Sequence, residues 1–90
     1  MLFMVIERFK GGDSRPVGER FQAKGRMMPD GVVYHASWVD PADMRCFQVM
    51  EAASAESLEG WISCWRDLID FELVEVLSSA EFWAGSRIDR

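Results

Sequence analysis

The side chains best suited to chemistry lie close together, within residues 32–51. This segment holds the only histidine of the chain, His35, together with Ser37, Cys46 and Gln48. A histidine titrates near neutral pH and can act as a general base. A neighbouring amide can orient its ring, and a hydroxyl or thiol can supply a hydrogen bond or a weak nucleophile. These four residues are therefore the candidate ligand-binding residues.

A β-hairpin is expected to position them. Two runs rich in β-branched and aromatic residues flank a turn built on Asp40 and Pro41. With a two- or four-residue loop within residues 40–43, side chains alternate between the two faces of the hairpin. The pairs expected on one face are Ser37 with Cys46, His35 with Gln48, and Val33 with Met50. The pairs expected on the other are Trp38 with Arg45, Ala36 with Phe47, and Tyr34 with Val49.

Simpler interpretations of the same residues stay open. His35 and Gln48 can bond to each other or to the backbone and be inert. Cys46 can be a small buried hydrophobic residue, because no cationic neighbour at helix spacing would lower its pKa. Trp38 opposite Arg45 can form a stabilising cation–π pair. An odd-length loop would change which residues share a face.

Motifs of the common catalytic and metal-binding sites are missing. The sequence contains no GxGxxG, Walker loop, HExxH or GxSxG. One histidine and two cysteines without CxxC spacing do not make a zinc site. The second helical segment has no histidine, which disfavours a His-ligated haem. We therefore expect no cofactor and no metal.

Composition narrows the partners. The net charge is −5 and no basic stripe is present, which argues against nucleic acid and anionic membranes. No apolar run approaches the roughly 20 residues of a membrane span. The apolar start MLFMVI is typical of a strand rather than of a signal peptide. Cys46 and Cys64 are expected to be reduced thiols of a cytoplasmic protein.

Local patterns predict a single ferredoxin-like domain over residues 1–90, with the order β-α-β-β-α-β. Strands are expected at 2–9 and 71–77, on either side of the hairpin, and a first helix at 14–26. A second helix follows Ser54 and carries an apolar stripe at helical spacing. The stripe consists of Leu58, Trp61, Ile62, Trp65 and Leu68. Ser78 and Glu81 match a capping box that starts a short C-terminal helix, with residues 85–90 expected to fray.

Such a fold places two helices on one face of a four-stranded antiparallel sheet. The other face should be polar in a monomer, but the first strand has no polar residue before Glu7. Nearly half of the chain, 49%, is hydrophobic, which is more than a small monomer easily buries. We therefore expect a homodimer through the sheet face, forming a dimeric α+β barrel with twofold symmetry.

Several segments resemble a small bacterial family of unknown function among the dimeric α+β barrel proteins. They are MLFMVIERF, RPVGERFQAKGRMMPDGV, SWVD, RCFQVMEA and residues 68–71. The resemblance covers about residues 1–84. It implies the ferredoxin-like barrel fold but supplies no catalytic residues. Relatives in the wider barrel group include small-molecule monooxygenases, haem-degrading enzymes, muconolactone isomerases and stress-response proteins, so the fold alone does not select an activity.

Three functions follow as hypotheses. The first is a barrel that binds or senses a small molecule without chemistry. The second is a cofactor-independent oxygenase or isomerase acting on a small aromatic or enolic substrate, with His35 as base and Gln48 or Ser37 holding an oxyanion. The third is a structural or regulatory dimer module.

Overall fold

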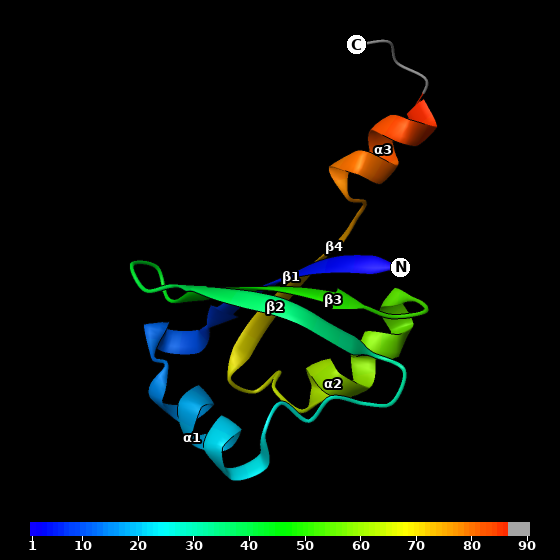
Figure 1. Cartoon of the computed structure of the whole chain (residues 1–90). Helices are drawn as coiled ribbons and strands as arrows, with labels where there is room; N and C mark the ends of the chain where they lie inside the picture. Colours follow the sequence, from blue (N-terminus) through cyan, green and yellow to red (C-terminus); the bar gives the residue numbers. More distant parts are fainter. Residues whose placement is uncertain (87–90) are drawn as a thin grey trace.

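The computed structural model describes residues 1–86, which form a helix-covered antiparallel sheet (Figure 1). Its strands are β1 (Leu2–Phe9), β2 (Val33–Asp40), β3 (Arg45–Glu51) and β4 (Ile69–Val76). They are arranged in the order β2-β3-β1-β4, and every neighbouring pair is antiparallel. With the helices between them, this order confirms the predicted α+β, ferredoxin-like fold.

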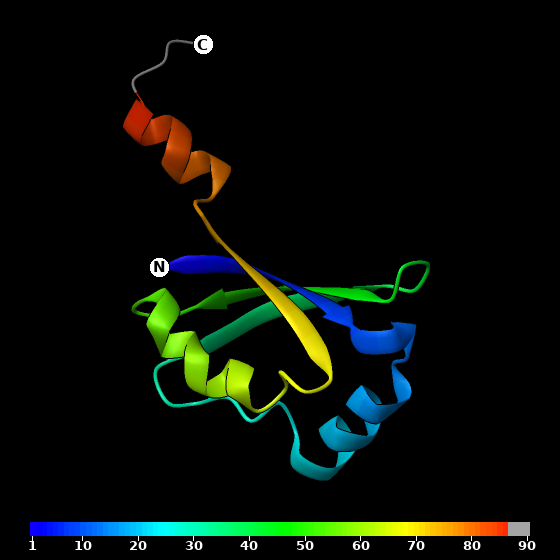
Figure 2. The same ribbon diagram turned by 180° about the vertical axis from the view of Figure 1, so that it is seen from behind.

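Two helices cover one face of the sheet, and a third projects away on the other side (Figures 1 and 2). The covering helices are α1 (Arg15–Lys24) and α2 (Glu59–Ser63), the latter preceded by the 3₁₀ turn η2 (Ala55–Leu58). A second 3₁₀ turn, η1 (Lys10–Gly12), follows β1. The projecting helix is α3 (Ser79–Ser86), which helps to raise the radius of gyration to 14.9 Å, against about 12 Å for a compact chain of this length.

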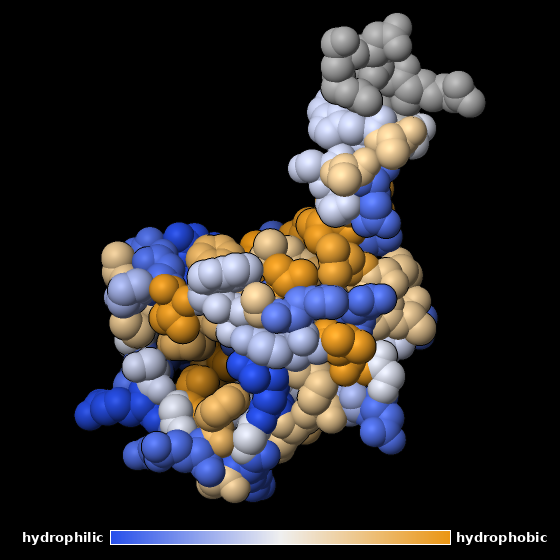
Figure 3. Space-filling model, viewed as in Figure 1, coloured by the Kyte–Doolittle hydropathy of each residue, from blue (hydrophilic) through white to orange (hydrophobic). Residues whose placement is uncertain are grey.

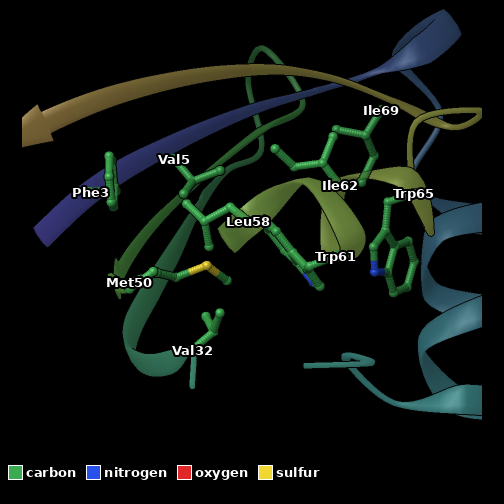
Figure 4. Packing of buried hydrophobic residues seen from close by; sticks show 10 residues of the cluster. Phe3, Val5, Val32, Met50, Leu58, Trp61, Ile62, Trp65 and Ile69 are labelled. Carbon is green, nitrogen blue, oxygen red and sulfur yellow. The ribbon is translucent and has the colours of Figure 1, made fainter. Parts of the chain in front are cut away.

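The core lies between the sheet and α2 (Figure 4). Leu58, Trp61, Ile62 and Trp65 of the predicted stripe are buried against Phe3, Val5 and Met50 from the strands. Burying an aliphatic or aromatic side chain of this size stabilises the fold by about 1.5–3 kcal/mol. The stripe therefore holds the second helical segment on the sheet.

The second helix is shorter than its apolar stripe predicts. Ser54 caps the segment as expected, because its Oγ accepts from the backbone N–H of Ser57. However, α2 ends at Ser63 and residues 64–68 continue as turns. The carbonyl of Gly60 accepts bonds from the Ser63 hydroxyl at 2.7 Å and the Cys64 thiol at 3.4 Å, side-chain bonds that compete with the helical ladder.

The hairpin forms, but its predicted register is wrong by two residues. Val39 faces Cys46 and Ser37 faces Gln48, around a loop of residues 41–44. The cause is an ion pair across the hairpin end, where Arg45 contacts the Asp40 carboxylate at 2.8 Å. The Asp40 carboxylate also accepts from the backbone N–H of Ala42. Asp40 therefore stays in the strand, and the loop starts at Pro41 rather than at Asp40.

A β-bulge near the start of β2 changes the expected faces. The ladder shifts between Tyr34 and Ala36, and His35 has no partner in the strand register. The expected pairing of His35 with Gln48 is therefore wrong. So is that of Trp38 with Arg45, since Trp38 lies opposite Phe47 and the Arg45 guanidinium lies 5.1 Å from the Phe47 ring.

The predicted capping box begins α3. The Ser78 hydroxyl accepts from the backbone N–H of Glu81 at 3.1 Å, and the Glu81 carboxylate accepts from that of Ser78. Gly85 and Ser86, expected to fray, belong to α3, and residues 87–90 of the expected frayed segment lie outside the described residues. None of the helices within residues 1–86 has the length and apolar character needed to cross a membrane.

Candidate ligand-binding site

A pocket of about 380 Å³ opens between α1 and the helix-covered face of the sheet. The space-filling view shows a hollow with apolar walls on the side of the molecule where α1 lies (Figure 3). The strands supply its floor, and α1 with the α2 segment supplies its walls. Glu7, Ser37, Cys46 and Gln48 are the polar and sulfur-containing side chains that the strands contribute.

The register of the sheet brings these four residues together. Glu7 lies opposite Cys46 across β1 and β3, and Gln48 lies opposite Ser37 across β3 and β2. Side chains two residues apart share a face, so Cys46 and Gln48 point the same way. The two-residue error in the predicted register leaves this grouping intact, because only an odd shift exchanges the faces.

The walls of the pocket are apolar and aromatic. Val17 and Phe21 come from α1, while Trp61 and Trp65 come from the α2 segment. Trp61 and Trp65 are 2% and 4% exposed, so they belong to both the core and the pocket.

Arg26 supplies the positive charge in the pocket lining. Its backbone carbonyl accepts hydrogen bonds from both indole N–H groups, at 3.0 Å from Trp61 and 3.2 Å from Trp65. Its guanidinium lies 3.9 Å from the centre of the Tyr34 ring and 5.2 Å from that of Phe21. The indoles therefore fix the backbone of Arg26, and the aromatic rings hold its charge beside the pocket.

A second arginine fastens α1 to the chain after α2. The Arg20 guanidinium donates to the Asp67 carboxylate at 2.7 Å and to the Cys64 carbonyl at 2.9 Å. It also lies 5.8 Å from the Trp65 ring. These contacts join the two helical walls of the pocket.

Glu7 is the buried acid of the site. It is only 4% exposed, and burial raises the pKa of its carboxyl from 4.5 to about 7. A hydrogen bond from Gln48 and the positive charge of Arg26 oppose this rise. Near neutral pH the carboxyl is therefore shared between its charged and neutral forms, as a general acid or base requires.

Gln48 links Glu7 to the open space of the pocket. Its Nε2 donates to Oε2 of Glu7, which orients the amide. Its Oε1 is buried and has no hydrogen-bond partner within residues 1–86. Buried polar atoms are nearly always paired in folded proteins, so this oxygen marks a position where a donor is missing.

Cys46 and Ser37 have weaker chemical roles. Burial, together with the charge of Glu7, raises the pKa of the Cys46 thiol to about 11, so the thiol is protonated at neutral pH and is a poor nucleophile. The Ser37 hydroxyl shares a hydrogen bond of 2.7 Å with the Tyr34 hydroxyl.

His35 lies apart from the other three candidates. The bulge places its Nε2 3.0 Å from the carboxylate of Glu51, where both side chains are about half exposed. A separate surface hollow contains His35, Glu51, Leu2 and residues at the foot of α3. The structure thus groups Ser37, Cys46 and Gln48 in one pocket and puts His35 outside it.

Two residues of the pocket were not among the sequence candidates, Glu7 and Arg26. Glu7 could have been recognised from the sequence, because it is the one charged residue on the strand face that also carries Phe3, Val5 and Phe9. Arg26 could not have been recognised in this way, because it follows α1 in a loop whose path depends on hydrogen bonds to two distant indoles. Within residues 1–86 no group of three or more His, Cys, Asp or Glu residues could hold a metal ion.

Comparison with known proteins confirms one part of the resemblance noted in the sequence, the membership of a family of unknown function. The model of one family, DUF3303, a domain of unknown function, matches residues 1–86. No curated protein and no solved structure matches the chain significantly. The chain therefore belongs to the DUF3303 family.

Proposed function

We propose that this protein binds a small, largely apolar molecule in the pocket between α1 and the sheet. The observation that carries the proposal is the Glu7–Gln48 pair, buried at the floor of an apolar pocket with one amide oxygen unpaired. Burying such a pair costs free energy that two apolar side chains of similar size would avoid. A ligand that forms a hydrogen bond with this pair would offset part of that free energy.

The dimensions of the pocket support the same function. Its volume of about 380 Å³ falls within the range of about 300–1,000 Å³ found for small-molecule sites. Aromatic walls and a few convergent polar groups are the usual composition of such sites. The ligand would contact Phe21 and Trp65 with its apolar part and Gln48 with its polar part.

A binding screen with a blocked variant tests this function. Amide chemical shifts of ¹⁵N-labelled protein would be followed while small aromatic compounds are added. Gly18 lines the pocket, and a Cβ built there meets no atom within 4 Å. A leucine at this position, Gly18→Leu, should fill the pocket and abolish the shifts, whereas Gly18→Ala should preserve them.

Two outcomes would count against the proposal. One is a screen in which no compound shifts the resonances of the pocket residues. The other is binding that is equal in Gly18→Leu and in the wild type, which would put the ligand elsewhere.

Proton transfer is a second candidate function, and the raised pKa of Glu7 favours it. A carboxyl in an apolar site with a pKa of about 7 is suited to removing a proton next to a carbonyl group. We propose Glu7, rather than His35, as the base of any such reaction, because Glu7 lines the pocket and His35 lies outside it.

Deuterium exchange offers a direct test of that candidate. The probe is 2-tetralone, a bicyclic ketone whose acidic C–H exchanges with solvent. The wild type should accelerate the exchange and Glu7→Gln should not, whereas His35→Ala should behave as the wild type. Equal exchange rates for wild type and Glu7→Gln would exclude Glu7 as the base.

We also propose a homodimer through the open face of the sheet. By the alternation of the strands, this face carries apolar side chains on each of them, and hydrophobic residues gather where the body of the molecule meets α3 (Figure 3). The apolar residues of this face are Leu2, Met4, Ile6, Val33, Ala36, Trp38, Phe47, Val49, Val74 and Val76. Two such faces packed together would complete the α+β barrel, and the exposed Phe82 and Trp83 of α3 would lie beside the joint.

The mass in solution tests the dimer. Sedimentation at micromolar concentration should give twice the chain mass of 10.3 kDa for the wild type and a single chain mass for Met4→Glu. Met4 lies between Val49 and Val74 at the centre of the open face. The control is Val39→Glu, a change on the helix-covered side, which should stay dimeric. A monomeric wild type would refute the dimer and the barrel.

We propose further that the chain is one cytoplasmic domain of a bacterial protein. All strands of the described residues share one sheet, which supports a single domain. Cys46 and Cys64 are both free, as is usual for proteins of reducing compartments. The family resemblance supports the bacterial origin.

A further inference from the structure

The orientation of the Gln48 amide decides what kind of group the pocket can accept. Because its nitrogen faces the Glu7 carboxylate, its oxygen must face the other way. Gln48 is only 5% exposed, and it lines the pocket. Its Oε1 is buried and has no partner among residues 1–86, so the wall of the pocket contains an unsatisfied hydrogen-bond acceptor.

Side chains near this oxygen do not supply the missing donor. Ser37 lies opposite Gln48 in the ladder, but its hydroxyl bonds to that of Tyr34 and makes no hydrogen bond to the amide oxygen. Cys46 has only a thiol, which is a weak donor. A water molecule would need two or more polar partners to be held there, and most of the lining is apolar. Arg26, the cationic residue of the lining, makes no hydrogen bond to this oxygen either, so a ligand can supply the donor.

The charges of the lining restrict the ligand further. Glu7 and Arg26 are its acidic and its basic residue, and Cys46 is its remaining titratable group. Each of these two residues offsets the attraction that the other would give a charged ligand, and moving a charged group into an apolar pocket costs desolvation free energy. A neutral ligand avoids that cost. The aromatic walls, which include Phe21 and Trp65, favour a flat hydrophobic frame.

We propose that the pocket selects neutral aromatic molecules that carry an O–H or N–H group, and that this group donates to Oε1 of Gln48. The inference rests on the proposed ligand-binding function and adds the chemical class of the ligand. Aromatic alcohols and N–H heteroaromatic rings belong to this class, whereas their O-methyl and N-methyl derivatives do not.

Three related probes test the selection: 2-naphthol, 2-methoxynaphthalene and naphthalene. They share the ring system, but only 2-naphthol has a donor. Dissociation constants would be measured with the wild type by the shifts of the pocket amide resonances. Because an unpaired buried acceptor is costly, 2-naphthol should bind at least about tenfold more tightly than either other probe.

A matched pair of variants identifies the acceptor. Gln48→Met keeps the length of the side chain and removes the amide, so the preference for 2-naphthol should fall below about twofold. Gln22→Met makes the same change at an exposed position of α1 and should retain the full preference. The comparison of the three probes in the wild type does not depend on Gln48→Met folding.

The outcomes separate the two proposals. If the three probes bind equally well, the pocket binds ligands but the selection for a donor is refuted. If none of them shifts the pocket resonances while other compounds of the screen do, the proposed ligand class is refuted; if no compound does, the ligand-binding function itself is refuted. If the preference survives in a folded Gln48→Met protein, the donor does not bind to Gln48.

Discussion

The pH dependence of stability is the sharpest test of the buried carboxyl. Glu7 is 4% exposed, and burial raises its pKa from 4.5 in the unfolded chain to about 7 in the folded one. The folded protein therefore holds the proton more tightly than the unfolded chain. The stability linked to this proton is fully present below pH 4.5 and is lost as the pH rises through 7.

The magnitude follows from the difference between the two pKa values. At 1.36 kcal/mol for each pH unit, the free energy of unfolding should fall by about 3 kcal/mol between pH 4.5 and pH 8. Glu7→Gln keeps the shape of the side chain and cannot titrate. It should therefore match the wild type below pH 4.5 and exceed its stability by up to about 3 kcal/mol at pH 8.

Other groups with shifted pKa values titrate outside this window. Hydrogen bonds from arginine side chains lower the pKa of Asp13, Asp40 and Asp67 below 3.8, so they act only in stronger acid. Burial raises the pKa of Cys46 to about 11, above the window. The part of the change between pH 5 and pH 8 that Glu7→Gln removes thus reports on Glu7.

Urea unfolding at fixed protein concentration, in steps of half a pH unit from 5 to 8, measures the effect. The exposed Glu19→Gln variant on α1 serves as the control and should follow the wild-type profile. Parallel profiles for wild type and Glu7→Gln would refute the argument, because they would mean that Glu7 titrates alike in the folded and unfolded chains.

Three further predictions concern the scaffold. Gly18→Ala should raise the free energy of unfolding by about 0.5–1 kcal/mol, because Gly18 is helical with open space around it. Gly31→Ala should lower the free energy of unfolding by about 1 kcal/mol, because Gly31 has a φ of +84° that alanine adopts poorly. Urea unfolding measures both changes. At pH 8 only about one thousandth of Cys46 is thiolate, so a disulfide reagent should label it far more slowly than Cys64, as peptide mapping would show. Ser78→Ala removes the cap of α3 and should lower its stability by about 1 kcal/mol, measured as faster hydrogen exchange of α3 amides with the sheet unchanged.

Features set by local spacing could be predicted from the sequence. Leu58, Trp61, Ile62 and Trp65 follow the period of a helix and are buried. The Ser78 cap also depends on residues a few positions away. Such patterns are readable because one turn of chain contains all the interacting groups.

Features set by contacts across the sheet were harder to foresee. The ion pair of Asp40 with Arg45 chose one hairpin register over another that fits the alternation equally well. No glycine in the sequence indicates the bulge at His35, yet because of the bulge the histidine lies outside the pocket. The grouping of Ser37, Cys46 and Gln48 was nevertheless predictable, since it depends only on whether the register shift is an even or an odd number of residues.

The contacts between the helical walls determine how the pocket can open. The bond of Arg20 to Asp67 joins α1 to the chain after α2. The Arg26 carbonyl, which accepts from both indoles, joins the loop after α1 to the α2 segment. Moving α1 away from the α2 segment would break the bonds of Arg20, which matter because α1 itself buries no residue against the sheet. The edge strand β2 also borders the pocket, where Val39 is 59% exposed. If a ligand binds here as proposed, we expect its exchange with solvent to respond to substitutions that break the Arg20–Asp67 bond as well as to substitutions along β2.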